Sequence, residues 1–284
     1  MKNKYLIIGG DSKLGKYLSI YLEKKNFFFL KTFKKKKKFF LYLDLKNPKK
    51  FKIPNKINYC FFLAGVTDYE KCEKIKQSRI INVNNTVFLI KKLINKGVHV
   101  NFISSNTVFG GITSRTNEND KKNPKFAYAK HKSHCEDKLL KWTKKNKCQN
   151  LLSVTRLTKI LDTNTRPFPL WKKKILLNKK ISCFEDYYFS PISFEFVCKS
   201  LIKISNSKYF GIFHLSNKEN INYFEFSKIY FKPKKNLIKA ISLNQTKKNN
   251  FYYKPIFSNI KMSRTKKILN INPERIKNLL KTIN

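Results

Sequence analysis

The chain is poor in glycine, in acidic residues and in long apolar runs. Its 284 residues include eight glycines and 17 aspartates and glutamates, against 62 lysines and arginines, so the formal net charge is +45. The apolar runs fall short of the ~18–20 residues that span a membrane, and we expect no membrane span. The opening "MKNKYLIIGGDSKLG" has a short apolar run that breaks into glycines, which predicts a strand and not a secretory signal peptide.

Cysteine is sparse and without pattern. The six cysteines are scattered and form no C-x-x-C pair. This usage is typical of reduced thiols, and we expect a cytoplasmic protein without a disulfide framework. His131 and His134 share a predicted helix face with Cys135 nearby, but a metal ion needs further ligands, and the sequence offers no second cluster. We therefore expect no metal site.

Arginine is scarce as well, which bears on the large positive charge. Only six residues are arginine, leaving 56 lysines, and lysine lacks the planar fork with which arginine reads bases and phosphates. The lysines are spread along the whole chain, and the run "FKKKKKFF" at 33–40 is the exception, where five of them are consecutive. We therefore expect no specific nucleic-acid partner. The alternative, a basic nucleic-acid-binding protein, would show a steeply salt-dependent affinity for DNA.

Apolar runs and helical patterns alternate along the first half of the chain. This alternation predicts β-α-β units and a parallel sheet that is covered on both faces. The expected strands are 5–10, 27–33, 39–45, 57–65, 98–105 and 151–157, and the expected helices are the segment after the first strand, 80–97 and 125–146. After about residue 158 the pattern loosens into a smaller mixed α/β region. Its tail is expected to hold one strand-like run and a final helix near 274–283.

Three of the eight glycines lie together between the first strand and the first helix, in "GGDSKLG". Gly9 and Gly15 take the outer positions of a G-x-x-G-x-x-G spacing, and Ser12 takes the middle one. Glycines there permit a tight turn, a close approach of the backbone to a pyrophosphate and close packing of the helix on the strand. The segment predicts a dinucleotide-binding loop, and an ordinary β-α turn is the alternative.

Further glycines follow later strands. Gly65 ends "FFLAG", and Gly110 and Gly111 end "FISSNTVFGG". Ligands of doubly wound sheets bind at the carboxyl ends of the strands, so these segments converge on one edge. We predict an α/β fold with a Rossmann-type doubly wound parallel sheet. Its dinucleotide-binding domain covers residues 1–158, and a smaller substrate-binding region, partly interleaved with the first, covers residues 159–284.

A tyrosine and a lysine four residues apart occur in "AYAKHK" at 127–132. Chance alone predicts about three such Y-x-x-x-K pairs in a chain this rich in lysine. The sequence has four, which begin at Tyr21, Tyr42, Tyr128 and Tyr230. The pair therefore carries no weight by itself, and its setting has to decide.

The order of the motifs supplies that setting. The segments "GGDSKLG", "LAGVTDYEKCE", "INVNNT", "FISSNTVFGG", "P-x-x-x-Y-x-x-x-K" at 124–132 and "VTRLTK" follow one another. In this order the chain resembles the extended short-chain dehydrogenase/reductases. Within them it is most similar to the dTDP-4-dehydrorhamnose reductase branch of sugar-nucleotide-binding proteins. The resemblance runs from residue 4 to about residue 231 and includes weaker matches at 184–193 and 211–216.

The resemblance implies an NAD(P)-dependent oxidoreductase with three catalytic residues, Ser105, Tyr128 and Lys132. Tyr128 would give a proton to a substrate carbonyl oxygen as hydride reaches the carbonyl carbon, and Ser105 would orient that oxygen. Lys132, one helical turn after Tyr128, would lower the pKa of the phenol and hold the nicotinamide ribose.

The resemblance also implies a set of cofactor-binding residues. Besides Tyr128 and Lys132 they are Gly9, Ser12, Lys13, Leu14, Gly15, Lys31, Asp44, Leu45, Ala64, Gly65, Thr67, Asn84 and Ser104. The second strand reads "FFFLKTFKKKKK" and ends in ammonium groups, where a site that prefers NAD usually has an acid. We therefore expect NADP(H), with its 2′-phosphate attracted to the lysines at 34–38. NAD(H) and a purely solvated lysine loop are the alternatives.

Departures from the branch concern the substrate. Thr107 stands where a tyrosine touches the sugar in that family, and Lys159 stands where a tryptophan does. Asn106 and Thr107 also replace the acidic pair of the 4,6-dehydratases, so we expect no dehydration. The expected substrate-binding residues are Thr107, Arg156 and Lys159, of which Arg156 and Lys159 would meet a diphosphate.

These features favour an NADP(H)-dependent reductase of a nucleotide-activated 4-keto sugar that serves surface-polysaccharide synthesis. A nucleotide-sugar 4-epimerase with tightly bound NAD and a non-catalytic dinucleotide-binding regulatory subunit are the alternatives. The expected partner is a small nucleotide-sugar substrate, and a homodimer stays open.

Overall fold

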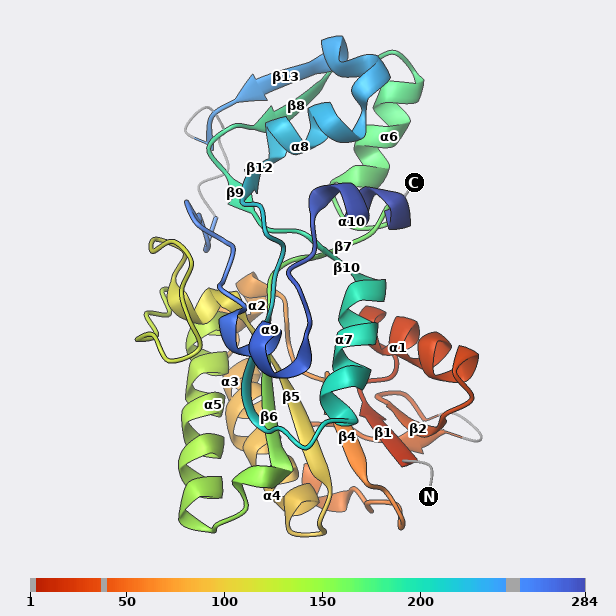
Figure 1. The fold of residues 1–284 in the computed structure, drawn as a ribbon, viewed down its shortest axis with the longest axis vertical. Coiled ribbons are helices and arrows are strands. Elements are labelled where there is room, and N and C mark those ends of the chain that lie inside the picture. Colours follow the sequence, from red (N-terminus) through yellow and green to blue (C-terminus); the bar gives the residue numbers. More distant parts are fainter. Residues whose placement is uncertain (1–3, 37–39, 244–250, 284) are drawn as a thin grey trace.

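A seven-stranded parallel sheet with helices on both faces forms the larger part of the protein, and a smaller lobe lies beyond the end of its strands (Figure 1). The computed structural model describes residues 4–36, 40–243 and 251–283, so residues 37–39 of the lysine run and of the expected third strand lie outside the described residues. The predicted Rossmann-type doubly wound fold is confirmed. Within the described ranges, no helix is both long and apolar enough to cross a membrane.

The sheet has the strand order β11-β6-β5-β4-β1-β2-β3, and each neighbouring pair is parallel. Its strands are β1 Lys4–Ile8, β2 Phe28–Phe33, β3 Leu41–Tyr42, β4 Tyr59–Phe62, β5 His99–Ser105, β6 Leu152–Leu157 and β11 Gly211–Leu215. The chain runs outward from β1 to β3 and then returns to the other side of β1 as β4. Such a reversal opens a crevice at the carboxyl ends of the two central strands, where folds of this kind bind ligands.

Helices cover both faces because both faces of the strands are apolar. The helices of this part are α1 Lys13–Lys24, α2 Tyr69–Lys74, α3 Lys76–Arg79, α4 Thr86–Ile94, α5 Ala127–Lys145, α7 Phe194–Ser205 and α9 Ser263–Leu269. Successive side chains of a strand point to opposite faces. Leu6 and Ile8 of β1 accordingly pack with α4 and α5, whereas Tyr5 and Ile7 pack with α1, α7 and α9.

The smaller lobe has an apolar core of its own, rich in aromatic rings. It consists of α6 Phe168–Leu176, β8 Ile181–Phe184, β9 Tyr188–Phe189, β12 Ile221–Asn222, α8 Tyr223–Tyr230, β13 Ile238–Ile241 and α10 Ile276–Ile283. The short strands β7 Ile160–Leu161 and β10 Ile192–Ser193 pair with each other where the chain passes between the lobes (Figure 1). The segments of the small lobe are separated along the chain by α7, β11 and α9, which pack with the sheet.

Irregular helical turns occupy several of the connections. They are the 3₁₀ turns Pro48–Lys50, Asn106–Phe109, Gln149–Leu151 and Lys232–Leu237, and a π-helix over Ile80–Asn85. The expected helix at 80–97 is therefore a π-helix that continues as α4. The tail holds the expected strand, β13, and final helix, α10, and also α9, which the sequence did not predict.

Candidate active site

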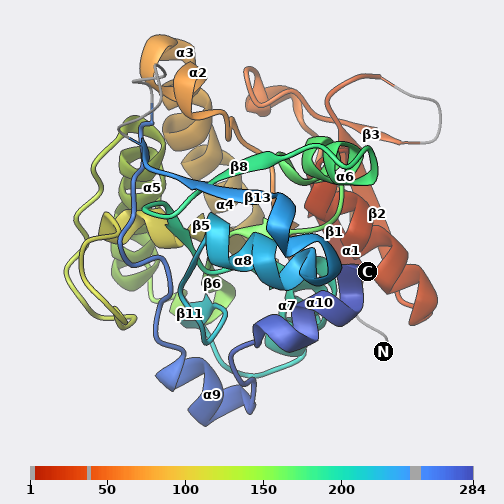
Figure 2. The same cartoon turned by 90° about the horizontal axis from the view of Figure 1, so that it is seen from above.

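The loops after β1, β4, β5 and β6 open into one cavity of about 580 Å³. Its facing wall comes from the smaller lobe and from the segment 253–258. In the view of Figure 2, elements of the smaller lobe such as α8 and β13 lie in front of the sheet. The residues that line the cavity come from both parts. A second cavity of about 340 Å³ adjoins it near β2 and β4 and shares Ser12, Leu63 and Thr67 with it.

The glycine loop has a shape that only glycine allows at two positions. Gly9 has a φ of +93°, and a Cβ on Gly15 would lie 2.3 Å from the carbonyl oxygen of Gly9. Ser12 Oγ accepts a hydrogen bond from Gly15 N at 3.0 Å and donates one to Gly9 O at 2.7 Å. The residue that departs from the glycine spacing is thus the N-cap of α1 and stabilises the loop.

We expect Gly15→Ala to disrupt this loop. Backbone atoms of Gly9 and Gly10 lie 2.3 and 2.8 Å from the place of the new Cβ, and backbone cannot rotate aside as a flexible side chain can. The variant should lose dinucleotide binding in a fluorescence titration and melt at a lower temperature. Gly97→Asn is the control, because Gly97 has open space around it and a φ of +75° that asparagine tolerates. Wild-type binding by Gly15→Ala would contradict a phosphate-binding role of the loop.

Most of the expected cofactor-binding residues line these cavities. The larger cavity is lined by Ser12, Lys13, Leu14, Thr67, Ser104, Tyr128 and Lys132, and the smaller by Gly9, Ser12, Asp44, Leu45, Ala64, Gly65 and Thr67. Lys34 and Asp11 also line the smaller cavity, where Lys34 N donates to Asp11 Oδ2 at 3.3 Å. The continuous lining, together with a loop in which a Cβ has no room, fits an extended dinucleotide.

The three expected catalytic residues lie on the walls of the larger cavity. Ser105 ends β5, and Tyr128 and Lys132 lie on the first two turns of α5. Lys132 Nζ donates to the carbonyl oxygen of Ile103 at 2.7 Å and lies 5.9 Å from the centre of the Tyr128 ring. The lysine thus connects the helix that carries the tyrosine to the strand that carries the serine.

Burial shifts the pKa of both titrating groups. It raises the pKa of the Tyr128 phenol above its ordinary value, with the nearby Cys72 adding to the rise. It lowers the pKa of Lys132 to about 8, against the opposing effects of Cys135, Glu136 and Cys72. The ammonium of Lys132 is bonded to Ile103 O in this state, and its expected lowering of the phenol pKa stays a prediction. A phenol that stays protonated suits a proton donor.

Ser105 has donors of its own from the following turn. Its Oγ accepts hydrogen bonds from Thr107 N at 3.2 Å and from Thr107 Oγ1 at 3.0 Å. Its hydroxyl donates to Asn106 Oδ1 only over 3.4 Å, which is long for such a bond. Thr107 therefore lines the cavity, as expected, but its side chain acts on Ser105, and the weakly held serine proton can turn to a ligand.

Lys159 also lines the larger cavity, where its ammonium donates to Tyr223 Oη and lies 5.9 Å from the centre of the Phe189 ring. Arg156 does not, and its predicted role on a diphosphate is corrected. Only 2% of Arg156 is exposed, and its guanidinium pairs with Glu136 at 2.7 Å beneath the cavity. The arginine lies on β6, three residues before Lys159, and alternation turned its side chain towards α5.

Three expected cofactor residues do not line either cavity. Gly15 lies within the glycine loop, where its N donates to Ser12 Oγ at 3.0 Å. Asn84 is exposed on the π-helix, and Asn82 takes the place by the cavity, where it accepts from Val66 N at 2.7 Å and donates to Val66 O at 2.8 Å. The extra residue in each π-helical turn shifts the register that an α-helix would have. Lys31 has its ammonium over the aromatic ring of Phe29, outside the residues that line the two cavities.

The sequence reasoning missed the aromatic wall of the larger cavity. This wall consists of Tyr187, Phe189, Tyr223 and Tyr253. The rings of Phe189 and Tyr223 stack at 4.3 Å, and Tyr187 stacks on Tyr223 at 5.5 Å. The segment "FEDYYFSPIS" at 184–193 was a signal for part of it, but Tyr253 comes from the tail, far from any motif.

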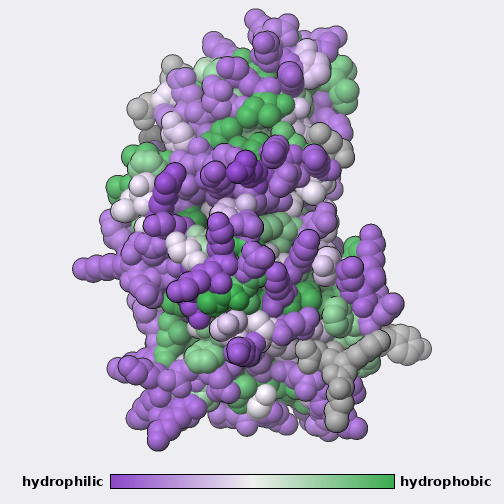
Figure 3. Space-filling view, in the orientation of Figure 1, coloured by the Kyte–Doolittle hydropathy of each residue, from purple (hydrophilic) through white to green (hydrophobic). Residues whose placement is uncertain are grey.

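Hydrophilic side chains cover both lobes on the face shown in Figure 3, with small apolar patches between them. Within the described residues, no three His, Cys, Asp or Glu side chains are grouped so that they could hold a metal ion.

Comparison with known proteins agrees with the fold. The family described as the RmlD substrate binding domain matches residues 3–284. The dTDP-4-dehydrorhamnose reductase of Bacillus anthracis, solved with NADP, is similar with a TM-score of 0.79 at 19% identity. The alignment covers 100% of this chain and 98% of the reductase chain. The Yersinia enterocolitica reductase has a TM-score of 0.81 at 19% identity, over 99% and 98%. The dTDP-glucose 4,6-dehydratase of B. anthracis, solved with NAD, has a TM-score of 0.76 at 13% identity, over 98% and 96%. No curated protein matches by sequence.

Proposed function

The chain belongs to the RmlD substrate binding domain family, and on this premise we propose that it is an NAD(P)-dependent oxidoreductase of the extended short-chain dehydrogenase/reductase type. It would reduce a nucleotide-activated 4-keto sugar with NADPH. The observation that carries the proposal is that Ser105, Tyr128 and Lys132 line one cavity. That cavity adjoins the glycine loop on one side and an aromatic, lysine-bearing wall on the other, as a site for a dinucleotide and a second ligand requires.

The glycine loop and the smaller cavity would hold the cofactor. The α1 N-terminus would present backbone N–H groups to the pyrophosphate, and Asp44 and Leu45 would bound the adenosine side. NADPH, when bound, supplies the hydride to the carbonyl carbon of the substrate. Lys34, at the end of β2 in the same cavity, would pair with the 2′-phosphate.

Tyr128 would donate its proton to the carbonyl oxygen of the substrate. Its neutral phenol is favoured by burial, and the ammonium of Lys132 stabilises the phenolate once the proton has left. Ser105 would donate its weakly held proton to the same oxygen, while Thr107 keeps donating to Ser105 Oγ. The two donors would stabilise the negative charge that develops on this oxygen.

The lining of the larger cavity favours an anionic substrate. Among the described residues that form it, Lys13, Lys132 and Lys159 are charged and none is acidic, while Lys13 pairs with Asp162, which is not part of the lining. A diphosphate fits this balance, and the aromatic wall fits the apolar faces of a sugar or a base. The similar structures named dTDP-4-dehydrorhamnose reductase support a keto-sugar nucleotide as the substrate, and its use in surface-polysaccharide synthesis is part of the proposal.

We expect Lys159→Ala to weaken the binding of the substrate. An ammonium that hydrogen-bonds a phosphate contributes about 1.5–3 kcal/mol, so KM for the sugar nucleotide should rise about tenfold or more with little change in kcat. Lys159→Arg, which keeps the charge, should restore most of the affinity. An unchanged KM in Lys159→Ala would show that the diphosphate binds elsewhere.

A titration of the cofactor-free protein with NADPH and with NADH tests both the choice of cofactor and the proposed dinucleotide-dependent function. Binding is measured by the quenching of aromatic fluorescence. We expect tighter binding of NADPH. Lys34→Ala should weaken it about twofold to fivefold, as an exposed ion pair does, and leave NADH unchanged. The neighbouring Lys35→Ala is the control. Equal binding of both would favour the 4-epimerase with NAD, for which Asp11 in the same cavity offers an acid to the ribose. Binding of neither would overturn the proposal.

A further inference from the structure

A cluster of charged side chains lies buried beneath the larger cavity, between α5 and the sheet, and the proposed chemistry does not use it. Its centre is Glu136 on α5, which is 0% exposed, and Arg156 on β6, which is 2% exposed. Burying charges is costly unless each is paired and hydrogen-bonded. We therefore expect the directional bonds of the cluster to serve a purpose besides stability.

Glu136 joins three parts of the chain. Its carboxylate accepts from Arg156 Nη2 at 2.7 Å and from Arg156 Nε at 3.1 Å, both from β6. It also accepts from Ser104 Oγ at the end of β5 and from Lys122 Nζ at 3.2 Å, in the segment before α5. Lys122 in turn pairs with Asp137 at 2.7 Å, so the two carboxylates balance the two cations.

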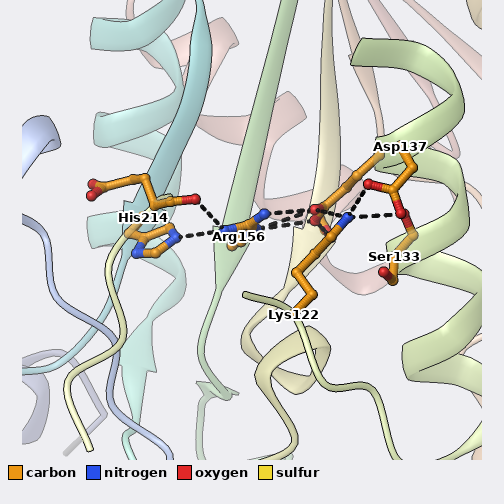
Figure 4. Close-up of polar contacts among 8 residues, drawn as sticks. Lys122, Ser133, Asp137, Arg156 and His214 are labelled. Atoms are coloured by element: carbon orange, nitrogen blue, oxygen red, sulfur yellow. Dashed lines mark hydrogen bonds and ion pairs between the residues drawn. The ribbon is translucent and has the colours of Figure 1, made fainter. Parts of the chain in front are cut away.

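The far side of Arg156 is equally constrained. Figure 4 shows Arg156 between His214 on one side and the residues of α5 on the other. Arg156 Nη1 donates to Glu118 O at 3.0 Å and lies 3.3 Å from His214 Nε2. Since His214 Nδ1 is 2.9 Å from the carbonyl oxygen of Lys261, it is the donor there, and Nε2 accepts from Arg156. The imidazole is therefore neutral, and the guanidinium is held at both ends.

The position of Glu136 relates it directly to the catalytic groups. Tyr128, Lys132 and Glu136 recur every four residues, so they form one face of α5. Ser104, which donates to Glu136, immediately precedes Ser105, and Lys132 donates to the carbonyl oxygen of Ile103 just before. The bonds of Glu136 and of Lys132 thus fasten the same face of α5 to the same end of β5.

We propose that Glu136 and Arg156 are positioning residues, whose ion pair holds α5 at the one axial position on β5 and β6 that brings Tyr128 and Lys132 to Ser105. An apolar contact could hold the helix to the sheet as firmly, but it tolerates sliding, whereas the bidentate geometry of arginine and carboxylate does not. This inference rests on the proposed function for its kinetic consequences, but not for its structural ones.

The test removes both charges in a Glu136→Gln/Arg156→Met double variant. Glu136→Gln alone would leave a buried guanidinium unpaired, and its unfolding would say nothing about position. We expect the double variant to fold, with kcat lowered about tenfold to a hundredfold by the misplaced proton donor and with KM for the sugar nucleotide unchanged. Hydrogen exchange of residues 127–135, measured without any ligand, should be faster than in the wild type.

Asp137→Asn is the matched control, because Asp137 bonds the same Lys122 from the next position on α5 but is 61% exposed. It should keep wild-type kcat and exchange. A double variant with wild-type kcat and wild-type exchange overturns the inference. Should the double variant not fold, Ser104→Ala decides by the same exchange measurement, because it removes a neutral donor to Glu136. A wild-type protein that binds neither dinucleotide overturns the proposed function instead, and the exchange of 127–135 still decides the inference.

Discussion

Tyr128→Phe should fold and bind NADPH as the wild type does, yet lose about a hundredfold to ten-thousandfold of kcat in the reduction of the keto-sugar nucleotide. The change removes only the phenol oxygen. The ring keeps its contacts with Tyr69 at 5.3 Å and Phe126 at 6.3 Å, so the helix and the cavity wall are preserved. Because burial holds the phenol protonated, Tyr128 enters the reaction with the proton that the variant lacks. The loss of NADPH absorbance under saturating substrate measures the effect.

The chain offers its own control for this experiment, another Y-x-x-x-K pair. Tyr42 precedes Lys46 by four residues, but it lies on the edge strand β3 and is 45% exposed. Tyr42→Phe should leave kcat within about twofold of the wild type, as surface changes usually do. Wild-type kcat in Tyr128→Phe would mean that the proton comes from solvent or from Ser105.

The parts of the site that depend on local backbone geometry could be predicted from the sequence. In a chain with so few glycines, Gly9 and Gly15 were expected at positions where a side chain has no room. A Cβ on either residue would indeed clash with backbone atoms. Tyr128 and Lys132 were distinguished from three similar pairs by the order of the surrounding motifs, which resembles that of the family, and by their place near the start of the helix after β5. Strand ends and helix starts are set by short-range patterns, which a single sequence carries.

The parts that depend on tertiary register could not be predicted. Asn84 and Asn82 differ by two residues, and only the π-helix decides which of them reaches the loop after β4. An arginine such as Arg156 is a residue type that often binds phosphate, but the packing of α5 on β6 places its guanidinium in an ion pair with Glu136. Tyr253 reaches the cavity from a tail that no periodic pattern describes. Each of these placements depends on contacts between segments far apart in the chain.

Lys132→Met should inactivate the protein and stabilise it at the same time. The ammonium holds the face of α5 to Ile103 O and would stabilise the phenolate of Tyr128, so its loss should lower kcat/KM about a hundredfold or more. Yet burial lowers the pKa of Lys132 from its ordinary 10.5 to about 8, which means that the folded protein disfavours the charge. Near neutral pH, methionine should therefore raise the free energy of unfolding by about 1–3 kcal/mol.

The pH dependence of this stabilisation identifies its cause. Between about pH 8 and pH 10.5 the unfolded chain keeps a proton on Lys132 that the folded protein has released, so wild-type stability rises with pH across this window relative to the variant. The advantage of Lys132→Met should be fully present below about pH 8 and should vanish by about pH 10.5 in urea unfolding. Lys141→Met, at an exposed position of the same helix, should show neither the gain nor its pH dependence. A variant less stable than the wild type at neutral pH would show that the bond to Ile103 O outweighs the cost of burying the ammonium. Lys132 would then stabilise the fold as well as serve the chemistry.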